Sequence, residues 1–229
     1  MTPTPNPTLV RDLFDQIAPR YNQINTLMSW GRHLAWKRLA AQWCFPAQPL
    51  GEVVDLCCGT GDLTRQLARV VPRAEVIWGV DFAEGMLRQA RQRVGLDRRI
   101  RWLQADVLDL PFAAGQMDGV TMAFGLRNVG DIPQCLGEIE RILKPGARAV
   151  ILDLCLRQDD GFQRWYLTEV VPRLGAWFNL ADQYAYLAPS LERFPEPPAL
   201  ALLARQVGFR TVTHRSLENG GIHFLVLQK

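Results

Sequence analysis

The sequence predicts a doubly wound α/β fold, in which a mostly parallel sheet lies between two layers of helices. Two observations carry this prediction. From Val53 onward, short apolar runs alternate with stretches whose apolar residues recur at helix spacing. The first run ends in a glycine-rich turn, and the second, residues 76–80, ends at an acidic residue. Strands that alternate with helices form a parallel sheet that binds ligands at the carboxyl ends of its strands.

The glycine-rich turn predicts a nucleoside site. Residues 53–62 read VVDLCCGTGD, and a helical pattern follows directly. Gly59 and Gly61 have no Cβ, so they can adopt positive φ and let a ligand approach the main chain. About 20 residues further on, Asp81 stands where an acid would bind the two ribose hydroxyls. The alternative interpretation is a plain strand–helix turn in which Asp62 caps the helix.

The type of nucleotide follows from what the turn lacks. The dinucleotide fingerprint requires a third glycine or an alanine, and this chain has Thr64 there. That difference argues against NAD or FAD, and so against a dehydrogenase. Two acids, Asp55 and Asp81, suit a nucleoside without phosphates. S-adenosylmethionine (SAM) fits best, because its sulfonium and ammonium groups are cationic.

The composition of the chain narrows the classes of protein to which it can belong. The chain has 229 residues, 48% of them hydrophobic, and a net charge of +3, which fit one globular domain. It contains no apolar run of about 20 residues and no signal-peptide pattern at its start. Its five cysteines show no C-x-x-C spacing, so we expect no metal site and a cytoplasmic location. Arginines crowd residues 88–101, either as a solvated helix face or as a surface for anionic lipids. No nucleic-acid-binding motif accompanies them.

The elements are expected in the following order. Residues 8–45 form amphipathic helices, the second over 32–43, which either cover the mouth of the site or pack as an ordinary helical layer. Five strands follow over 53–56, 76–80, 100–105, 118–124 and 149–154, each separated from the next by a helix or a turn. The sequence Lys144-Pro145-Gly146 ends the last of these helices. An aromatic-rich insertion, residues 157–198, forms a lid over an apolar channel or a peripheral helical pair. A helix over 199–207 and an antiparallel hairpin of strands 209–215 and 222–227 complete the chain.

Several motifs resemble one family. Residues 14–21 read FDQIAPRY, residues 124–129 read FGLRNV, and residues 141–146 read RILKPG. These stretches resemble the UbiE/MenG quinone C-methyltransferases, which belong to the class I SAM-dependent methyltransferases. Residues 55–59 (DLCCG) and 184–190 (YAYLAPS) are most similar to the cyanobacterial and chloroplast branch. That branch methylates the naphthoquinone ring of demethylphylloquinone.

The resemblance implies a seven-stranded Rossmann-like sheet and SAM-dependent C-methylation of a prenylated naphthoquinol, to phylloquinol or menaquinol. It also implies one domain over 1–229, with a helical cover (1–50), a SAM-binding core (51–155), an insertion (156–198) and a C-terminal helix and hairpin (199–229). Because the prenyl tail dissolves in lipid, we expect an enzyme at the membrane surface, which could act as a homodimer. A benzoquinol C-methyltransferase, an O-methyltransferase and a non-catalytic SAM-binding scaffold of a quinone-making assembly are the alternatives.

The resemblance also implies roles for individual residues. Arg127 and Asn128 would face the ring oxygen and stabilise a developing quinolate. His33 would accept a proton, or would simply pack in the cover. Tyr21 would order the hydroxyl or close the cofactor pocket. The residues expected to bind SAM are Asp55, Gly59, Thr60, Gly61, Asp81, Asp106, Val107 and Ala123, and Asp106 has a turn cap as its alternative role.

Three positions depart from the family's usual pattern. Asn22 replaces an Asp after the signature tyrosine, Ala123 replaces a Ser beside the cofactor, and Asp153-Leu154 replaces Glu-Phe after the fifth strand. The first weakens any proton role at residue 22, and the second removes one polar contact. The third conserves the negative charge.

Overall fold

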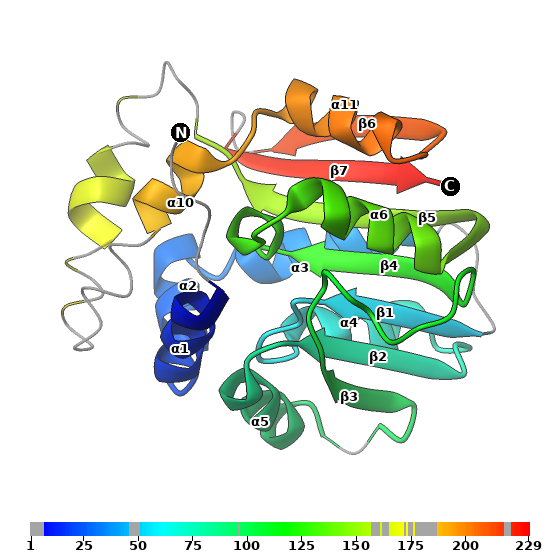
Figure 1. The fold of residues 1–229 in the computed structure, drawn as a ribbon. Helices are drawn as coiled ribbons and strands as arrows, with labels where there is room; N and C mark the ends of the chain where they lie inside the picture. The colour runs from blue at the N-terminus through cyan, green and yellow to red at the C-terminus, as the bar shows by residue number, and fades with distance from the viewer. Residues whose placement is uncertain are drawn as a thin grey trace.

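A seven-stranded sheet forms the centre of the computed structural model (Figure 1). The structure describes residues 7–45, 51–95, 97–156, 161, 165–171, 173, 176, 187–217 and 221–229. The strand order is β3-β2-β1-β4-β5-β7-β6. Strands β1 to β5 pair in parallel, whereas β7 pairs antiparallel with both β5 and β6. The predicted parallel sheet with an antiparallel hairpin at its edge is therefore confirmed.

The strands and helices follow the predicted order. The strands are β1 (Glu52–Leu56), β2 (Val76–Asp81), β3 (Ile100–Gln104), β4 (Met117–Ala123), β5 (Leu143–Leu154), β6 (Thr211–Leu217) and β7 (Ile222–Gln228). The helices are α1 (Pro7–Ile17), α2 (Tyr21–Ser29), α3 (His33–Cys44), α4 (Asp62–Val70), α5 (Glu84–Arg93), α6 (Ile132–Ile142), α10 (Leu187–Arg193) and α11 (Pro197–Gln206). Two shorter elements are the 3₁₀ helix η1 (Leu126–Asn128) and the π-helix η2 (Tyr166–Val170).

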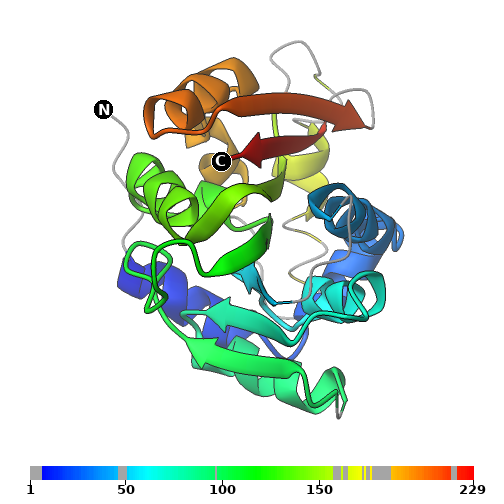
Figure 2. The same cartoon turned by 90° about the vertical axis from the view of Figure 1, so that its right-hand side faces the viewer.

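Helices cover both faces of the sheet, as Figure 1 and the view turned by 90° in Figure 2 show. Helices α6 and α11 lie on one face, and α3 and α4 lie on the other. Side chains alternate along a strand, so β5 contributes to both layers. Ala149 and Ile151 pack toward α6 and α11, whereas Val150 and Leu152 pack toward α3 and α4.

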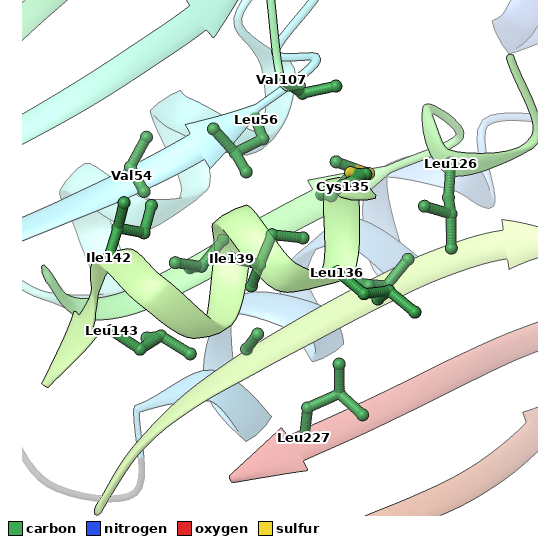
Figure 3. Close-up of a cluster of buried hydrophobic side chains, with 14 of the residues drawn as sticks. Val54, Leu56, Val107, Leu126, Cys135, Leu136, Ile139, Ile142, Leu143 and Leu227 are labelled. Atoms are coloured by element: carbon green, nitrogen blue, oxygen red, sulfur yellow. The ribbon is translucent and has the colours of Figure 1, made fainter. Parts of the chain in front are cut away.

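Helix α6 illustrates how the core is built (Figure 3). Leu136, Ile139 and Ile142 recur on one helical face and are fully buried against the side chains of β1 and β4. Burying an aliphatic side chain of this size stabilises the fold by about 1.5–3 kcal/mol. The helix begins at the carboxylate of Asp131, which accepts a hydrogen bond from the Gln134 N–H at 2.9 Å. It ends at Ile142, two residues before the predicted stop at Lys144-Pro145-Gly146.

Two element boundaries differ from the prediction. Strand β5 begins at Leu143, not at Ala149, and its pairing with β4 shifts register between Met117 and Gly119. The Lys-Pro-Gly stop therefore lies inside a strand, where Gly146 has a φ of 79°. A separate helix, α2, also interrupts the leader between the two predicted helices.

The leader has two different roles. Helix α3 packs on the sheet beside α4, so the packing interpretation holds for its aromatic stripe of Trp36, Leu39 and Trp43. Helix α1 lies against α5, and the Asp15 carboxylate accepts a 2.7 Å hydrogen bond from the Gly85 N–H. Only α1 and α2 are thus placed to cover a site.

The insertion is described in part. Trp165 and Tyr166 lie in the described residues, whereas Trp177, Phe178, Tyr184 and Tyr186 lie outside them. The lid therefore stays a prediction. Among the described residues, no helix combines the length and the hydropathy that crossing a bilayer requires.

Part of the arginine-rich stretch contributes to the fold. Arg91 pairs with Glu84 at 2.6 Å, and Arg99 pairs with Asp97 at 2.6 Å while donating to the Ala68 carbonyl at 2.9 Å. These arginines therefore stabilise contacts within the protein, a role that does not depend on lipid binding.

Candidate active site

A cavity lies at the carboxyl ends of the parallel strands, between the sheet and the leader. It encloses about 730 Å³, counting the space open to solvent. Pro7 and Phe14 of α1 and Tyr21 of α2 form one wall, and the loops after β1, β2, β3 and β4 form the others. Seven of the predicted site residues line it: Tyr21, Gly59, Asp81, Asp106, Val107, Ala123 and Asn128.

Two strained backbone positions shape the floor of this cavity. Cys57 and Phe124 both have positive φ, 51° and 60°. Such a conformation costs about 1–2 kcal/mol for a residue with a Cβ. Gly125 lies between them, and a Cβ there would come within 2.5 Å of the Cys57 Cβ. The two loops after β1 and β4 therefore approach as closely as a glycine permits, and strain of this kind gathers at binding sites.

Asp81 binds the glycine loop and also faces the cavity. Its carboxylate accepts hydrogen bonds from the Gly59 N–H at 2.8 Å and the Ala83 N–H at 3.0 Å. Burial raises the pKa of Asp81 to about 6, although these backbone donors lower it in part. The group is therefore an anion at neutral pH, and its remaining lone pairs can accept from two ribose hydroxyls.

Replacing Asp81 by alanine is expected to raise the SAM Kd at least tenfold. The change removes the hydroxyl acceptors and releases the Gly59 and Ala83 amides together. A tenfold change corresponds to about 1.4 kcal/mol of binding free energy. Titration calorimetry with SAM measures it, and Asp109→Asn, an exposed acid outside the cavity lining, is the matched control. Equal affinity in wild type and Asp81→Ala would remove the ribose assignment.

Three predicted SAM ligands lie outside the cavity lining and support the loop from behind. Asp55 is fully buried and accepts from the hydroxyls of Thr64 at 2.7 Å and Thr121 at 3.1 Å. Burial raises the pKa of Asp55 to about 7. Thr60 donates its hydroxyl to Asn22 of α2 at 2.8 Å. Gly61 is needed for helix packing, since a Cβ there would lie 2.6 Å from Val94.

Asp106 and Val107 are the residues that the resemblance implied would bind SAM after the third strand. Both line the cavity after β3. The Asp106 carboxylate also accepts from the Leu108 N–H at 3.0 Å, so the turn-cap role is present as well.

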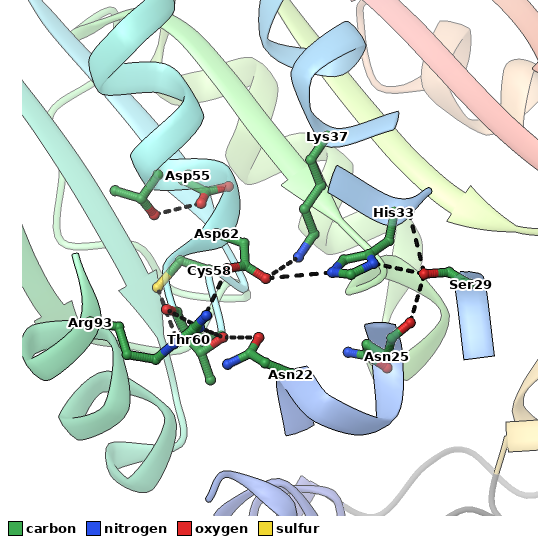
Figure 4. Close-up of polar contacts among 12 residues, drawn as sticks. Asn22, Asn25, Ser29, His33, Lys37, Asp55, Cys58, Thr60, Asp62 and Arg93 are labelled. Carbon is green, nitrogen blue, oxygen red and sulfur yellow. Dashed lines mark hydrogen bonds and ion pairs between the residues drawn. The ribbon is translucent and has the colours of Figure 1, made fainter. Parts of the chain in front are cut away.

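Beside the glycine loop, a polar network around a buried carboxylate joins the leader to the core (Figure 4). The Asp62 carboxylate is its centre and lies 3.4 Å from Lys37 Nζ and 3.3 Å from Arg93 Nη1. Burial raises the pKa of Asp62, but Lys37, Arg93 and His33 outweigh it and leave the pKa below its usual value. Arg93 also donates to the Thr60 hydroxyl at 3.0 Å. The network fixes the loop from three helices, α3, α4 and α5.

His33 belongs to this network and is absent from the cavity lining. Its Nδ1 lies 2.7 Å from the Ser29 hydroxyl, which itself donates to the Asn25 carbonyl at 2.6 Å. Its Nε2 lies 3.9 Å from Asp62. Burial first, and then the charge of Lys37, lower the pKa of His33 to about 4. The burial of the ring and its lowered pKa favour the alternative that His33 packs in the cover, and its role as proton acceptor stays a prediction.

The same pKa predicts how acid affects stability. The unfolded chain protonates a histidine near pH 6.5, whereas the folded chain resists until about pH 4. The resulting contribution to stability is present above pH 6.5 and is lost as the pH falls toward 4, by up to about 3 kcal/mol. We expect His33→Asn, which can keep the Ser29 bond, to lose less stability over that range. Urea unfolding at several pH values measures this, and parallel curves for both proteins would contradict it.

Arg127 and Asn128 lie on η1 but face different surroundings. Arg127 Nη1 donates to Asp153 at 2.5 Å and to the Phe124 carbonyl at 2.9 Å, and the guanidinium is absent from the cavity lining. Asn128 lines the cavity, with its Nδ2 3.3 Å from the Phe124 carbonyl. The buried Asp153 carboxylate thus holds the guanidinium behind the turn, and the role of Arg127 at the ring oxygen stays a prediction.

Several residues that shape the site were not predicted from the sequence. Lys37, Asp62 and Arg93 were not assigned to it, and neither was Asp153 as the partner of Arg127. One signal was available for Lys37. His33, Lys37, Ala40, Ala41 and Cys44 follow helix spacing and form the buried face of α3, which places two polar groups inside.

The fold and the cavity define a class I SAM-dependent methyltransferase. The sequence matches the ubiE/COQ5 methyltransferase family over residues 3–226, so the chain belongs to that family. It is similar to a 2-phytyl-1,4-naphtoquinone methyltransferase of Trichormus variabilis, with 43% identity over 96% of this chain and 98% of the relative. The counterpart in Thermosynechococcus vestitus is 45% identical over 97% and 100%.

Other relatives extend this comparison. A ubiquinone/menaquinone biosynthesis C-methyltransferase UbiE of Geobacter sulfurreducens is 40% identical over 90% of this chain and 82% of its own length. Among solved structures, a SAM-dependent methyltransferase from Aquifex aeolicus superposes with a TM-score of 0.62 at 18% identity, covering 90% and 97% of the two chains. The SAM complex of a Haemonchus contortus phosphoethanolamine N-methyltransferase gives 0.67 at 15% identity, over 94% and 60%. At such identities the structures support the fold alone.

Proposed function

We propose that the protein transfers the methyl group of SAM to a ring carbon of a naphthoquinol that carries a prenyl or phytyl tail. The observation that carries this proposal is the 40–45% identity, over nearly the full chain, to relatives named 2-phytyl-1,4-naphtoquinone methyltransferases. The cavity supports it, because Phe14, Phe82 and Met86 offer an apolar surface to a fused ring beside the residues expected to bind SAM.

The chemistry favours the reduced acceptor. SAM supplies an electrophilic methyl group, so the protein has to align the acceptor and make its ring carbon nucleophilic. An oxidised quinone is electron-poor, whereas a quinol that loses a hydroxyl proton gains electron density on the neighbouring carbon. A phenol has a pKa near ~10, so a hydrogen-bond donor at its oxygen would assist the deprotonation. Asn128 is that donor in our proposal, and Arg127 positions the turn from behind.

A benzoquinol acceptor is the second candidate. It is favoured by the similarity to the Geobacter sulfurreducens protein, whose name includes ubiquinone as well as menaquinone biosynthesis. The two acceptors differ by one fused ring, which the apolar walls of the cavity would recognise.

The proposal also concerns where the enzyme works. A tailed quinol dissolves in lipid while SAM is in water, so the protein would act in the cytoplasm at a membrane surface. The position of α1 and α2 beside the cavity supports this arrangement. A homodimer is the accompanying proposal on assembly, and light scattering of the purified protein tests it.

The test is methyl transfer from labelled SAM to reduced, phytyl-tailed demethylnaphthoquinol in detergent. A demethylated benzoquinol and the oxidised naphthoquinone serve as parallel acceptors. We expect label in the naphthoquinol alone. Label only in the benzoquinol would support the second candidate. SAM binding without transfer to any acceptor would contradict both and support the scaffold.

A further inference from the structure

The exposed apolar side chains gather at one end of the molecule. Five large hydrophobic residues of the described chain are exposed, and four of them lie on α1, at the end of α2 or beside η2. These four are Leu9, Leu27, Trp30 and Trp165, whereas the fifth, Leu202, lies on α11. Scattered apolar residues need no explanation, but a group carried in part by α1 and α2, the helices that line the cavity, does.

Three of the four lie on neighbouring stretches of chain. The Tyr166 hydroxyl donates to the Met28 carbonyl at 3.0 Å, which holds η2 against the end of α2. Leu27 precedes Met28, and Trp165 precedes Tyr166. Together with Trp30 they form what we call the outer patch: Leu27, Trp30 and Trp165, exposed by 46%, 88% and 50%.

The backbone holds Trp30 outward at an energetic disadvantage. Trp30 and Gly31 both have positive φ, 52° and 75°, in a turn closed by the Gly31 N–H on the Thr26 carbonyl at 2.8 Å. Glycine is the residue that such a position favours. The Trp30 indole has no hydrogen bond or ring contact with the described residues. A residue that strains the turn and is 88% exposed contributes little to the packing of the described residues, which points to a role in binding a partner.

We propose that the outer patch inserts into the surface of an anionic lipid bilayer, with Trp30 as its anchor. An indole combines an apolar ring with an N–H donor and prefers the headgroup level of a membrane. Residues 7–45 carry four exposed basic side chains (Arg11, Arg20, Arg32 and Arg38) and two exposed acidic ones, a charge that complements anionic headgroups. Tyr21 at the start of α2 lines the cavity and Leu27 lies near the end of the same helix, so α2 connects the cavity to this surface.

This inference rests on the proposed function, because an enzyme with a lipid-soluble acceptor has to reach that acceptor in a bilayer. A tail that enters the cavity past α1 could then remain in the lipid while the ring lies beside SAM. The enzyme would extract only the ring from the membrane.

Vesicle co-sedimentation without any acceptor tests the inference. We would compare phosphatidylcholine vesicles with vesicles in which phosphatidylglycerol makes up roughly a quarter of the lipid. Trp30→Gly is expected to lower the partition coefficient about tenfold, because it removes the largest inserted side chain. Its melting temperature should stay equal or rise, since the positive φ suits glycine. The matched control, Leu202→Gln, should bind as wild type does.

Two outcomes would overturn the proposal. One is equal partitioning of wild type, Trp30→Gly and Leu202→Gln. The other is a wild-type dimer that Trp30→Gly dissociates, which would make the outer patch a subunit interface. The vesicle-binding experiment contains no quinol, so its result does not depend on methyl transfer. A failure of methyl transfer in the detergent assay would therefore count against the proposed function but not against membrane binding by the outer patch. With a vesicle-embedded acceptor, Trp30→Gly should lower kcat/KM, and it should act as wild type in detergent.

Discussion

Replacing Arg127 by alanine is expected to destabilise the fold by about 3–5 kcal/mol, because removing one partner of a buried ion pair leaves the other charge uncompensated. The Arg127 and Asp153 side chains are only 10% and 3% exposed. Asp153 would keep the N–H groups of Arg127 and Leu154, at 3.3 and 2.8 Å, so the loss should lie toward the lower figure. Urea unfolding monitored by circular dichroism measures it, provided that the slope against denaturant is unchanged.

The double variant Arg127→Met with Asp153→Asn separates the fold from the chemistry. Replacing a buried ion pair by neutral side chains of similar size is often close to neutral for stability. We therefore expect the double variant to recover most of the lost stability. Its methyl transfer should nevertheless be slower than that of the wild type, because η1 loses the bond between the guanidinium and the Phe124 carbonyl. If the single and double variants were equally unstable, the ion pair would not be the cause.

The fold could be predicted because its signals are local. Each strand is a short apolar run, each helix has apolar residues at helix spacing, and the glycine loop lies where the first strand ends. The start of β5 could not be predicted in this way. Leu143 pairs with Met117 of β4 across the sheet, and that contact extends the strand through Lys144-Pro145-Gly146.

The site was predicted less well, because strand registers and helix faces decide which side chains reach a cavity. Asp81 is the last residue of β2, so its carboxylate faces the cavity. Asp55 lies one residue before the end of β1 and points into a helix layer, where it bonds Thr64 of α4. The two acids look alike in the sequence and differ only in that position.

Arg127 shows a second limit of sequence analysis. The motif places it beside Asn128, but only the folded chain brings Asp153 within reach of the guanidinium. The two residues are 26 positions apart, on η1 and at the end of β5. A charged residue in a motif therefore indicates a site without indicating which neighbour its charge will bind.

Asn128 is the residue on which the proposed chemistry depends most directly. Its side chain lines the cavity, and among the described residues its Nδ2 donates to the Phe124 carbonyl alone, at 3.3 Å. The second N–H of the amide is thus available to an acceptor oxygen. Removing one donor from a developing oxyanion slows comparable enzymes by about 100- to 1000-fold. We expect Asn128→Ala to lower kcat by that amount while the SAM Kd changes by less than about twofold.

Asn128→Asp is the sharper control, because it keeps the shape and replaces the donor by an acceptor. If the amide donates to the quinolate, the carboxylate repels it, and Asn128→Asp should be at least as slow as Asn128→Ala. Single-turnover methyl transfer at saturating SAM measures both, and unfolding curves confirm that both variants fold. An Asn128→Asp enzyme that kept most of its activity would show that the residue contributes shape and not a hydrogen bond. The donor to the ring oxygen would then have to come from another group lining the cavity, such as the Tyr21 hydroxyl.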